Sequence, residues 1–552
     1  IPSWMWNMMA LEELNLAATG LTGEIPSEIG TSLVENLKVL NLSFNSLTGT
    51  IPTEIGALTA LEKFWVWNNG LTGAVPSEIW GMQSLNELIL RENAFDELVI
   101  PVTGNLDILT YLDISECNLE STIPTELGNL VNLERLDLGN NKLIGAIPTE
   151  IYDGLVNLKV LNLVQNRLTG PIQTNIKNMS SLQELYLRGN SITGTIPSEI
   201  GELLDMRALW LDLRELTGAL PSELGLLKKL RDLYINNSEI SGSIPSQIGD
   251  MESLEALSFE NTKLTGVIPT EIGNLSVLKE LDLENNKLTG TIPTEFGNLS
   301  VLTHLFLGLN DFEIDGSNTF PNVTNIVTLA VLDLKSALRK DISDNFMIPT
   351  ELGRLINLIR LDLTYNYITG IIPTEIGNME NLEVLSLSNT WITGIIPAEI
   401  GNMVSLKNLD LSNMILSGNI PDLSGLIDLR TLTLGNNSYD DASYDKSSLG
   451  ISGEIPGSLL NLKNLTVLAL LNNKMTGPIP SEIVGLSNLE TLLLSGNDFT
   501  GSIPAEVANM ASLHTFKCKN TLICGELPPA MLPDSNDKVW IELSLPPNLP
   551  VC

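Results

Sequence analysis

The chain has 552 residues, of which 66 are acidic and 30 are basic, so its formal net charge at pH 7 is −36. Such a charge repels phosphate backbones and anionic lipid surfaces, which argues against binding to nucleic acids or membrane surfaces. Hydrophobic residues make up 43% of the chain and charged residues 17%, which is the composition of a folded protein.

The phrase L-x-x-L-x-L recurs about 21 times between Leu11 and Leu513, in most cases 24 residues apart. In a typical repeat, Leu281 and Leu283 alternate along a short strand and Asn286 turns the chain. One repeat cannot bury its leucines, but stacked repeats share a continuous core. The pattern therefore predicts a leucine-rich-repeat solenoid over residues 11–512, with a parallel β-sheet on its concave face.

The two ends of the chain differ from the regular repeats. Residues 1–10 have the form of the second half of a repeat, so we expect them to be the remainder of a truncated repeat. Residues 513–552 contain the last repeat and a segment with the form of a C-terminal cap. Because Cys518 replaces an inward leucine, Cys524 and Cys552 are the preferred disulfide pair.

Two stretches break the period. The repeats in residues 306–358 are longer than the others, and an insertion occupies residues 438–449. Insertions in solenoids emerge as loops, often on a binding face. The simpler interpretation here is a solvated loop, because lengthening a loop costs little free energy.

The second half of most repeats carries the phrase L-T-G-x-I-P or a close variant, for example at residues 47–52 and 288–293. This phrase resembles the plant-specific leucine-rich repeats of receptor-kinase ectodomains and polygalacturonase-inhibiting proteins. The resemblance implies a right-handed superhelix with a second small sheet, and 3-10 or short helices on the convex side. It also implies an exported protein, since such relatives bind peptides, hormones, glycans or other proteins. The regular T-E-I-G-N-L phrase also resembles algal families of secreted repeat proteins.

The residue between the two strand leucines points out onto the concave face. In three consecutive repeats this residue is Tyr186, Trp210 or Tyr234, whose rings we expect side by side, roughly 5 Å apart. Flanking concave positions add three arginines, namely Arg188, Arg207 and Arg231. Because Tyr, Trp and Arg dominate binding hot spots, we predict a ligand-binding patch here. The alternative is that the rings only shield one another.

A second aromatic group, consisting of Phe44, Trp65 and Trp67, lies near the start of the chain. We regard it as a secondary patch, for which shielding or packing between repeats is the simpler account.

Asn-x-Ser/Thr sequons favour an exported glycoprotein, although asparagine-rich repeats also generate them by chance. The candidate sites are Asn41, Asn178, Asn236, Asn274, Asn298, Asn322, Asn436 and Asn464.

The sequence lacks the residue patterns of an enzyme. Its two histidines, His304 and His514, lie about nine repeats apart, so they cannot support a nucleophilic triad. Zinc-ligand spacing, a phosphate-binding loop and a dinucleotide fingerprint are also missing. We therefore predict no catalysis, no cofactor and no metal.

These observations favour an extracellular or cell-surface module that recognises a protein, peptide or glycan through its concave face, without inserting into a membrane. The alternative is a structural or adhesive component of a cell wall, sheath or surface filament that associates with itself. Ice binding is a lesser alternative, because the aromatic and charged concave column does not suit a flat, ice-matching face.

Overall fold

A computed structural model describes residues 10–32, 36–98, 100–101, 106, 108–313, 322–338, 346–437 and 449–525. The chain divides into two compact units, Ile1–Leu278 and Lys279–Cys552. Nearly all of the expected partial repeat (residues 1–10), most of the insertion (438–449) and most of the C-terminal cap lie outside the described residues. The 21 strands of the main sheet confirm the predicted leucine-rich-repeat solenoid.

In the first unit, each repeat supplies one strand of the main sheet, and neighbouring strands pair in parallel. These strands are β1 (Glu13–Asn15), β3 (Val39–Asn41), β5 (Lys63–Trp65), β7 (Glu87–Ile89), β9 (Tyr111–Asp113), β10 (Arg135–Asp137), β12 (Val160–Asn162), β14 (Glu184–Tyr186), β15 (Ala208–Trp210), β17 (Asp232–Tyr234) and β19 (Ala256–Ser258).

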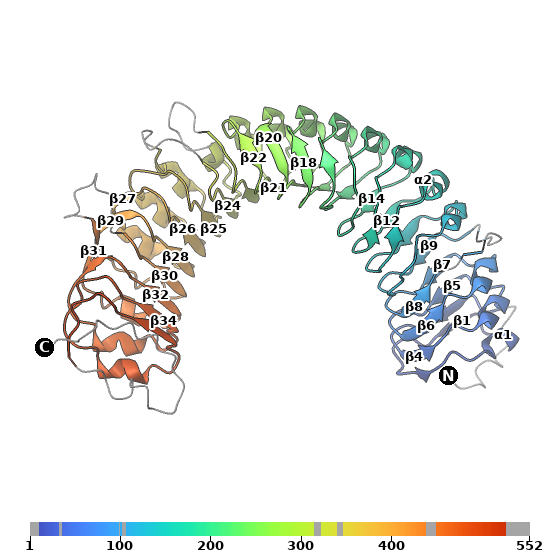
Figure 1. Cartoon of the computed structure of the whole chain (residues 1–552), viewed down its shortest axis with the longest axis horizontal. Helices are drawn as coiled ribbons and strands as arrows, with labels where there is room; N and C mark the ends of the chain where they lie inside the picture. Colours follow the sequence, from blue (N-terminus) through green and yellow to red (C-terminus); the bar gives the residue numbers. More distant parts are fainter. Residues whose placement is uncertain are drawn as a thin grey trace. The chain divides into compact units, whose positions relative to one another are not determined.

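The second unit repeats this arrangement. Its main-sheet strands are β21 (Glu280–Asp282), β23 (His304–Phe306), β24 (Val331–Asp333), β25 (Arg360–Asp362), β26 (Val384–Ser386), β28 (Asn408–Asp410), β30 (Thr431–Thr433), β32 (Val467–Ala469), β34 (Thr491–Leu493) and β35 (Thr515–Lys517). Within each unit, these strands line the inner side and the short helices the outer side (Figure 1).

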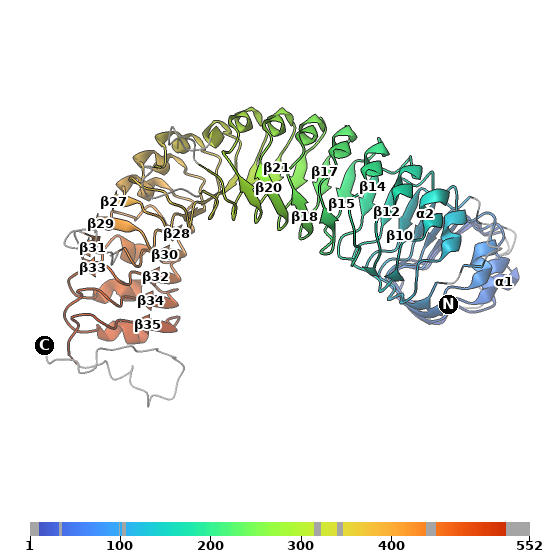
Figure 2. The same ribbon diagram turned by 45° about the horizontal axis from the view of Figure 1, so that its top comes forward.

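The L-T-G-x segments form the predicted second set of small parallel sheets, beside the main strands (Figure 2). In the first unit these strands are β2 (Thr22–Gly23), β4 (Ser46–Gly49), β6 (Gly70–Ala74), β8 (Ala94–Glu97), β11 (Ile144–Gly145), β13 (Arg167–Leu168), β16 (Thr217–Gly218), β18 (Glu239–Gly242) and β20 (Lys263–Val267). In the second unit they are β22 (Lys287–Thr289), β27 (Thr393–Ile395), β29 (Ile415–Asn419), β31 (Gly450–Gly453) and β33 (Lys474–Met475).

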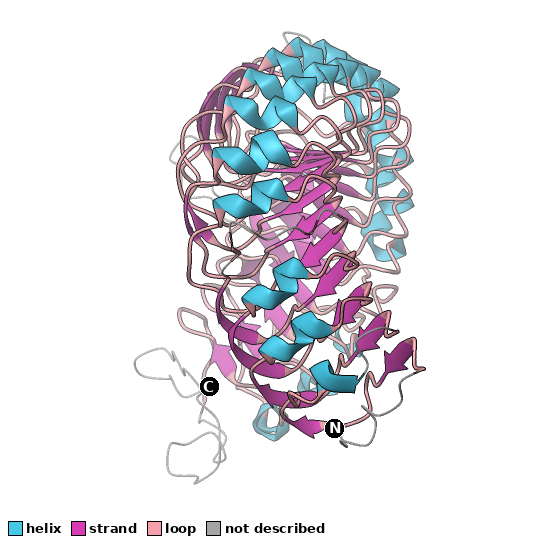
Figure 3. Ribbon diagram, turned by 90° about the vertical axis from the view of Figure 1, so that its right-hand side faces the viewer, coloured by secondary structure: helices cyan, strands magenta, loops and turns pink. Residues whose placement is uncertain are grey.

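Short helices, most of them 3-10 helices, follow the I-P phrase and form a layer apart from the strands (Figure 3). Those of the first unit are α1 (Ile29–Ser32), η2 (Thr53–Ala57), η3 (Ser77–Gly81), η4 (Thr125–Asn129), α2 (Thr149–Gly154), η5 (Thr174–Asn178), η6 (Ser198–Glu202), η7 (Ser222–Leu226), η8 (Ser246–Asp250) and η9 (Thr270–Asn274). Those of the second unit are η10 (Thr294–Asn298), η11 (Asn322–Asn325), η12 (Thr350–Arg354), η13 (Thr374–Asn378), η14 (Ala398–Asn402), η15 (Leu459–Asn461), η16 (Ser481–Gly485) and η17 (Ala505–Asn509).

The core of each unit is a set of aligned leucine columns. Leu185 pairs in register with Leu209, which pairs in register with Leu233, and all three are buried. The helical glycine of each repeat permits the close stacking of the coils, because a side chain at Gly201 would collide with the carbonyl oxygen of Glu223 in the next coil. The leucines therefore form one continuous core along each unit.

A ladder of buried asparagines ties most coils to their neighbours. The Asn190 side-chain amide donates to the carbonyl oxygens of Leu163 and Leu187, both at 2.8 Å, and its Oδ1 accepts the Leu168 N–H at 3.0 Å. Cys117 occupies the same repeat position, where it is buried and free. Its Sγ lies 3.3 Å from a carbonyl oxygen of the preceding coil, and burial raises the pKa of the thiol to about 12. The ladder satisfies backbone groups that a coil cannot satisfy alone.

Replacing Asn190 with alanine is expected to lower the free energy of unfolding by roughly 1–3 kcal/mol, because three buried backbone groups lose a partner. Arg214 occupies the same repeat position but is exposed, so Arg214→Ala is the matched control and should cost less than about 0.5 kcal/mol. Urea unfolding of the full chain measures both, and equal losses would show that the ladder contributes nothing special.

Candidate ligand-binding face

The predicted aromatic residues lie together on the concave face of the first unit. Tyr186 on β14, Trp210 on β15 and Tyr234 on β17 are in register as the last residues of adjacent strands. The Tyr186 and Trp210 ring centroids are 4.9 Å apart, and those of Trp210 and Tyr234 are 5.5 Å apart. Interplanar angles of 78° and 76° give two edge-to-face contacts, and we call the three rings the aromatic strip.

The rings of the aromatic strip are half-buried, so each keeps a surface that a ligand could cover. The Tyr186 hydroxyl donates to the Glu184 carboxylate at 3.1 Å. Burial, together with the nearby Glu184 charge, raises the pKa of Tyr186, so this phenol stays neutral at physiological pH. The Trp210 indole Nε1 is buried without a hydrogen-bond partner. The strip therefore presents mainly apolar ring faces.

The three predicted arginines lie at both edges of the aromatic strip. Arg207 and Arg231 are exposed and precede strands β15 and β17, whereas Arg188 follows β14. Arg231 lies within 4.0 Å of the Glu255 carboxylate, and Arg188 lies 3.4 Å from that of Asp212. Burial raises the pKa of Asp212 against the opposing effects of the Asn236 N–H and the Arg188 charge.

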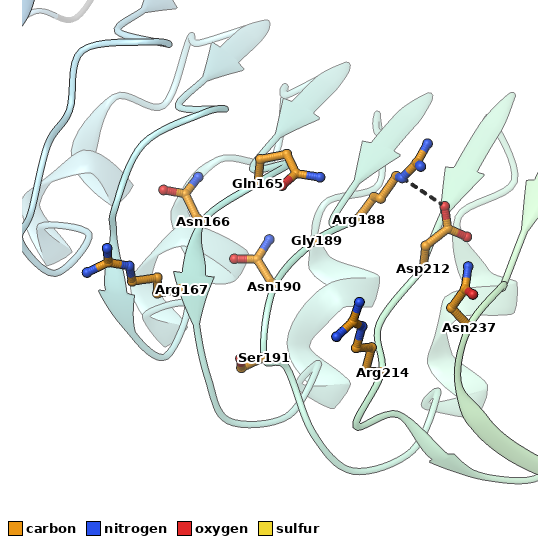
Figure 4. A pocket seen from close by; sticks show the side chains of 10 residues that line it. All are labelled: Gln165, Asn166, Arg167, Arg188, Gly189, Asn190, Ser191, Asp212, Arg214 and Asn237. Atoms are coloured by element: carbon orange, nitrogen blue, oxygen red, sulfur yellow. Dashed lines mark ion pairs between the residues drawn. The ribbon is translucent and has the colours of Figure 1, made fainter. Parts of the chain in front are cut away.

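A pocket of about 470 Å³ opens beside the aromatic strip, where the chain leaves the strands (Figure 4). Its lining residues are Gln165, Asn166, Arg167, Arg188, Gly189, Asn190, Ser191, Asp212, Arg214 and Asn237. Four consecutive repeats contribute to it, and the Arg188–Asp212 ion pair lies on its wall (Figure 4).

The turn after β15 lacks the positive φ found at this position in other repeats, and this difference explains both the pocket and its charge. In the other described repeats, the second residue after the L-x-L phrase has a positive φ, as at Gln165 (51°) and Asn237 (54°). Leu213 does not adopt this conformation and is fully buried, while Arg214, at the asparagine position, is exposed. Gly189, one repeat earlier, has no side chain. Two successive gaps in this column of side chains leave the pocket.

The pocket is locally basic within an acidic protein. Arg167, Arg188 and Arg214 line it, and Asp212 is its one acidic lining residue. Arg167 lies 3.3 Å from the Glu120 carboxylate. Arg214 has no ion pair or hydrogen bond with a described residue. Arg167, Asp212 and Arg214 were not among the predicted site residues. The sequence does show that Leu213-Arg214 replaces the ladder asparagine, which could have indicated this site.

The fold is shared with solved ectodomains of plant receptors. Leucine-rich-repeat family models match residues 131–192, 228–288 and 356–413, and residues 36–58, 109–130 and 488–510. The plant peptide hormone receptor RGFR1, solved in complex with RGF2, is 30% identical with a TM-score of 0.75, over 97% of this chain and 89% of that one. The Arabidopsis receptor kinase HAESA, solved with the peptide hormone IDA and the co-receptor SERK1, is 30% identical with a TM-score of 0.76, over 96% and 85% of the two chains.

This chain belongs to the plant-type leucine-rich-repeat family. A TDR receptor is also similar, with 27% identity and a TM-score of 0.71 over 94% of this chain and 90% of that one. No curated protein sequence matches the chain significantly.

The aromatic residues of the secondary patch contact one another or nearby basic side chains. Phe44 and Trp67 have ring centroids 3.9 Å apart at an interplanar angle of 63°. The Arg91 guanidinium lies 4.2 Å from the Trp67 ring centroid, and the Lys63 ammonium lies 5.5 Å from that of Trp65. The chain's own cations thus lie over both tryptophan rings. This arrangement favours shielding over ligand binding, and a ligand role for the patch stays a prediction.

The glycosylation candidates lie in several environments, and their modification stays a prediction. Asn178, Asn274 and Asn298 are exposed at the ends of η5, η9 and η10. Asn41, Asn236, Asn436 and Asn464 take part in hydrogen bonds, and the side chain of Asn322 is outside the described residues.

Three of the four cysteines lie in the described residues. Cys518 is buried and free, and Cys524 is disulfide-bonded. Its predicted partner Cys552 lies outside the described residues, so that pairing stays a prediction.

The described residues contain no group of three or more His, Cys, Asp or Glu side chains placed to hold a metal ion. In the same part of the chain, none of the helices has the length and apolarity needed to cross a membrane.

The concave column is less uniformly exposed than the sequence predicts. Asp113 and Asp137 lie next to each other in register on β9 and β10, and both are buried. Burial and the Asp113 charge raise the pKa of Asp137. The folded state therefore binds this proton more tightly than the unfolded state does, and stability falls as the pH rises through the raised pKa.

Replacing Asp113 with asparagine should lower the pKa of Asp137 and stabilise the protein above that pKa. Oδ1 can still accept from Ser115, and the new amide can donate to the Tyr111 hydroxyl. We expect a melting temperature higher by on the order of one degree at pH 7, and a smaller difference at pH values below the ordinary aspartate pKa. The same difference at both pH values would show that charge repulsion is not the cause.

Proposed function

We propose that this protein is an extracellular recognition module that binds a peptide, or an extended protein segment, along the concave face of its first unit. The observation that carries the proposal is the junction of the aromatic strip with the basic pocket. The strip offers apolar ring faces, and the pocket offers guanidinium groups within the same four repeats. Aromatic rings and arginines in that combination typify binding hot spots.

The chemistry of the site restricts the ligand. The aromatic strip suits an apolar or aromatic side chain, which it would cover without a large loss of side-chain entropy. The pocket suits one carboxylate, since a guanidinium can donate two parallel hydrogen bonds to it. A net charge of −36 repels strongly acidic ligands. The expected ligand is therefore neutral or basic overall and carries a single anionic group.

Similar proteins support this proposal. RGFR1 and HAESA have the same fold over most of both chains. RGFR1 is a peptide hormone receptor solved in complex with RGF2, and HAESA was solved with the peptide hormone IDA. Binding along a concave face requires only surface complementarity, so the proposed role needs neither a cofactor nor turnover.

Replacing Trp210 with alanine should weaken peptide binding by at least about tenfold, which corresponds to about 1.4 kcal/mol. The measurement is isothermal titration with peptides selected from a display library on the wild-type full chain. Trp65→Ala is the matched control, because Trp65 ends strand β5 in the same repeat position of the same unit. Thermal stability should change little in the Trp210 variant. Unchanged affinity together with a large loss of stability would make the strip structural.

Replacing Arg214 with glutamine should weaken binding only of peptides that carry an acidic residue for the pocket. The same peptide with that residue changed to its amide should bind wild type and variant equally, which completes a double-mutant cycle. Arg207→Gln is the control, because Arg207 is exposed at the opposite edge of the strip. A coupling energy near zero would exclude the pocket as the carboxylate site.

The alternative, a self-associating structural role, predicts a different result. In that case the unliganded protein should associate more as its concentration rises, and Trp210→Ala should abolish the association.

A further inference from the structure

The second unit has a row of exposed apolar side chains on its flank. Met347, Ile371 and Ile395 occupy the position before the I-P phrase in three consecutive repeats, and they are 53%, 60% and 61% exposed. Each side chain lies against the next coil, since a Cβ atom at Gly370 would be 2.6 Å from Met347 Cγ, and one at Gly394 would be 2.9 Å from Ile371 Cγ2. The three side chains therefore form a continuous row.

A second apolar row is formed by residues that come just before those of the first row along the chain. Both rows belong to the repeats that supply the small sheet of β27 and β29. Tyr367 and Trp391 precede Ile371 and Ile395 by four residues, and Tyr367 is exposed while Trp391 is partly exposed. Between the rows, the hydroxyls of Thr369 and Thr393 donate to backbone carbonyl oxygens of the preceding coil, at 3.1 Å and 2.9 Å. The hydroxyls are thus engaged inward, which adds to the apolar character of this surface.

The fold does not require these apolar side chains. At the position of Ile371, repeats of the first unit have Thr195 and Ser243. At the position of Tyr367 and Trp391, other repeats have charged residues such as Glu239 and Lys263. Contiguous exposed apolar residues that packing does not demand mark interaction surfaces.

A row of carboxylates borders the apolar rows. Glu351, Glu375 and Glu399 each follow the apolar residue by four positions, in the first turns of η12, η13 and η14. No ion pair joins any of them to a basic side chain among the described residues. A partner that covers the apolar rows would therefore place its own margin against three uncompensated negative charges.

We propose that this apolar flank, defined by Met347, Tyr367, Ile371, Trp391 and Ile395, docks a protein segment whose apolar side chains are bordered by lysine or arginine. Charge complementarity selects this occupant, because the carboxylate row attracts a basic margin. A second copy of this chain is disfavoured, since two molecules of net charge −36 repel each other. The surface belongs to the second unit and serves a partner other than the ligand of the aromatic strip.

The probe is a synthetic amphipathic peptide of leucine and lysine with one photo-reactive leucine analogue, applied to the full chain at physiological salt. A peptide with glutamate in place of every lysine is the control for charge. We expect the lysine peptide to bind and to crosslink mainly to residues around Ile371 and Ile395, as mapped by mass spectrometry. Crosslinks spread along the other acidic faces would overturn the proposal, as would equal binding of the glutamate peptide.

Variants test the flank directly. Ile371→Ser combined with Ile395→Ser should weaken binding of the lysine peptide by at least about tenfold. Val267→Ser is the matched control and should have no effect, because Val267 occupies the same repeat position, is 58% exposed and has Ser243 and Thr291 as its counterparts in the adjacent repeats. Melting temperatures confirm that each variant is folded.

Three further measurements separate the remaining interpretations. Glu375→Gln combined with Glu399→Gln should weaken lysine-peptide binding and reduce its salt dependence, whereas unchanged binding would overturn the role of the carboxylate row. Trp210→Ala should leave lysine-peptide binding intact, which distinguishes this proposal from that for the aromatic strip. Sedimentation that shows a dimer of the wild type, lost in the double isoleucine variant, would assign the flank to a second copy and overturn the basic partner.

Discussion

The whole structure depends on the sharing of backbone hydrogen bonds between coils. A coil of about 24 residues is too short to pair its own polar backbone, so its strand, its small-sheet segment and its asparagine all bond to the adjacent coil. Asn190 illustrates this, because its amide bonds carbonyl oxygens of two coils and its oxygen accepts an N–H of one. The inward positions are thereby held mainly by leucine and isoleucine, with asparagine at the ladder position of most repeats. The outward columns are free to vary, and both surfaces proposed to bind partners lie on them.

The basic pocket forms where this constraint is met in a different way. At the turn after β15, Leu213 takes the buried place that asparagine holds in most repeats, which exchanges a hydrogen-bonded ladder member for apolar packing. The exchange displaces Arg214 to the surface and removes one side chain from the outer column. Ladder bonds remain in the two preceding coils, at Asn166 and Asn190. The protein thus gives up one polar contact of the scaffold at the place where it gains a cation.

The period of the sequence translates directly into position, and this explains what could be predicted. The strand residues and the adjacency of Tyr186, Trp210 and Tyr234 follow from counting along a regular repeat, whereas the second sheet was implied by the resemblance to plant-type repeats. Burial on the concave face does not follow from counting, because the depth of Asp113 or Asp137 depends on the side chains around it. The sequence shows that Leu213-Arg214 replaces the usual ladder asparagine, but it does not show which backbone conformation the turn after β15 adopts. The apolar flank becomes apparent only when one outward position is compared across consecutive repeats, and this position lies outside the concave column.

Local departures from the average charge determine which partners the two surfaces suit. At physiological ionic strength, charges more than about 8 Å away are largely screened, so a docked ligand experiences mainly its nearest neighbours. Arg188 and Arg214 then outweigh the distant acidic residues inside the pocket, whereas Glu351, Glu375 and Glu399 dominate beside the apolar flank. The long-range field still repels acidic molecules during approach, which slows their association. One acidic chain can therefore present a site for a carboxylate and a site for a basic segment, because the mean charge governs encounter and the local charge governs binding.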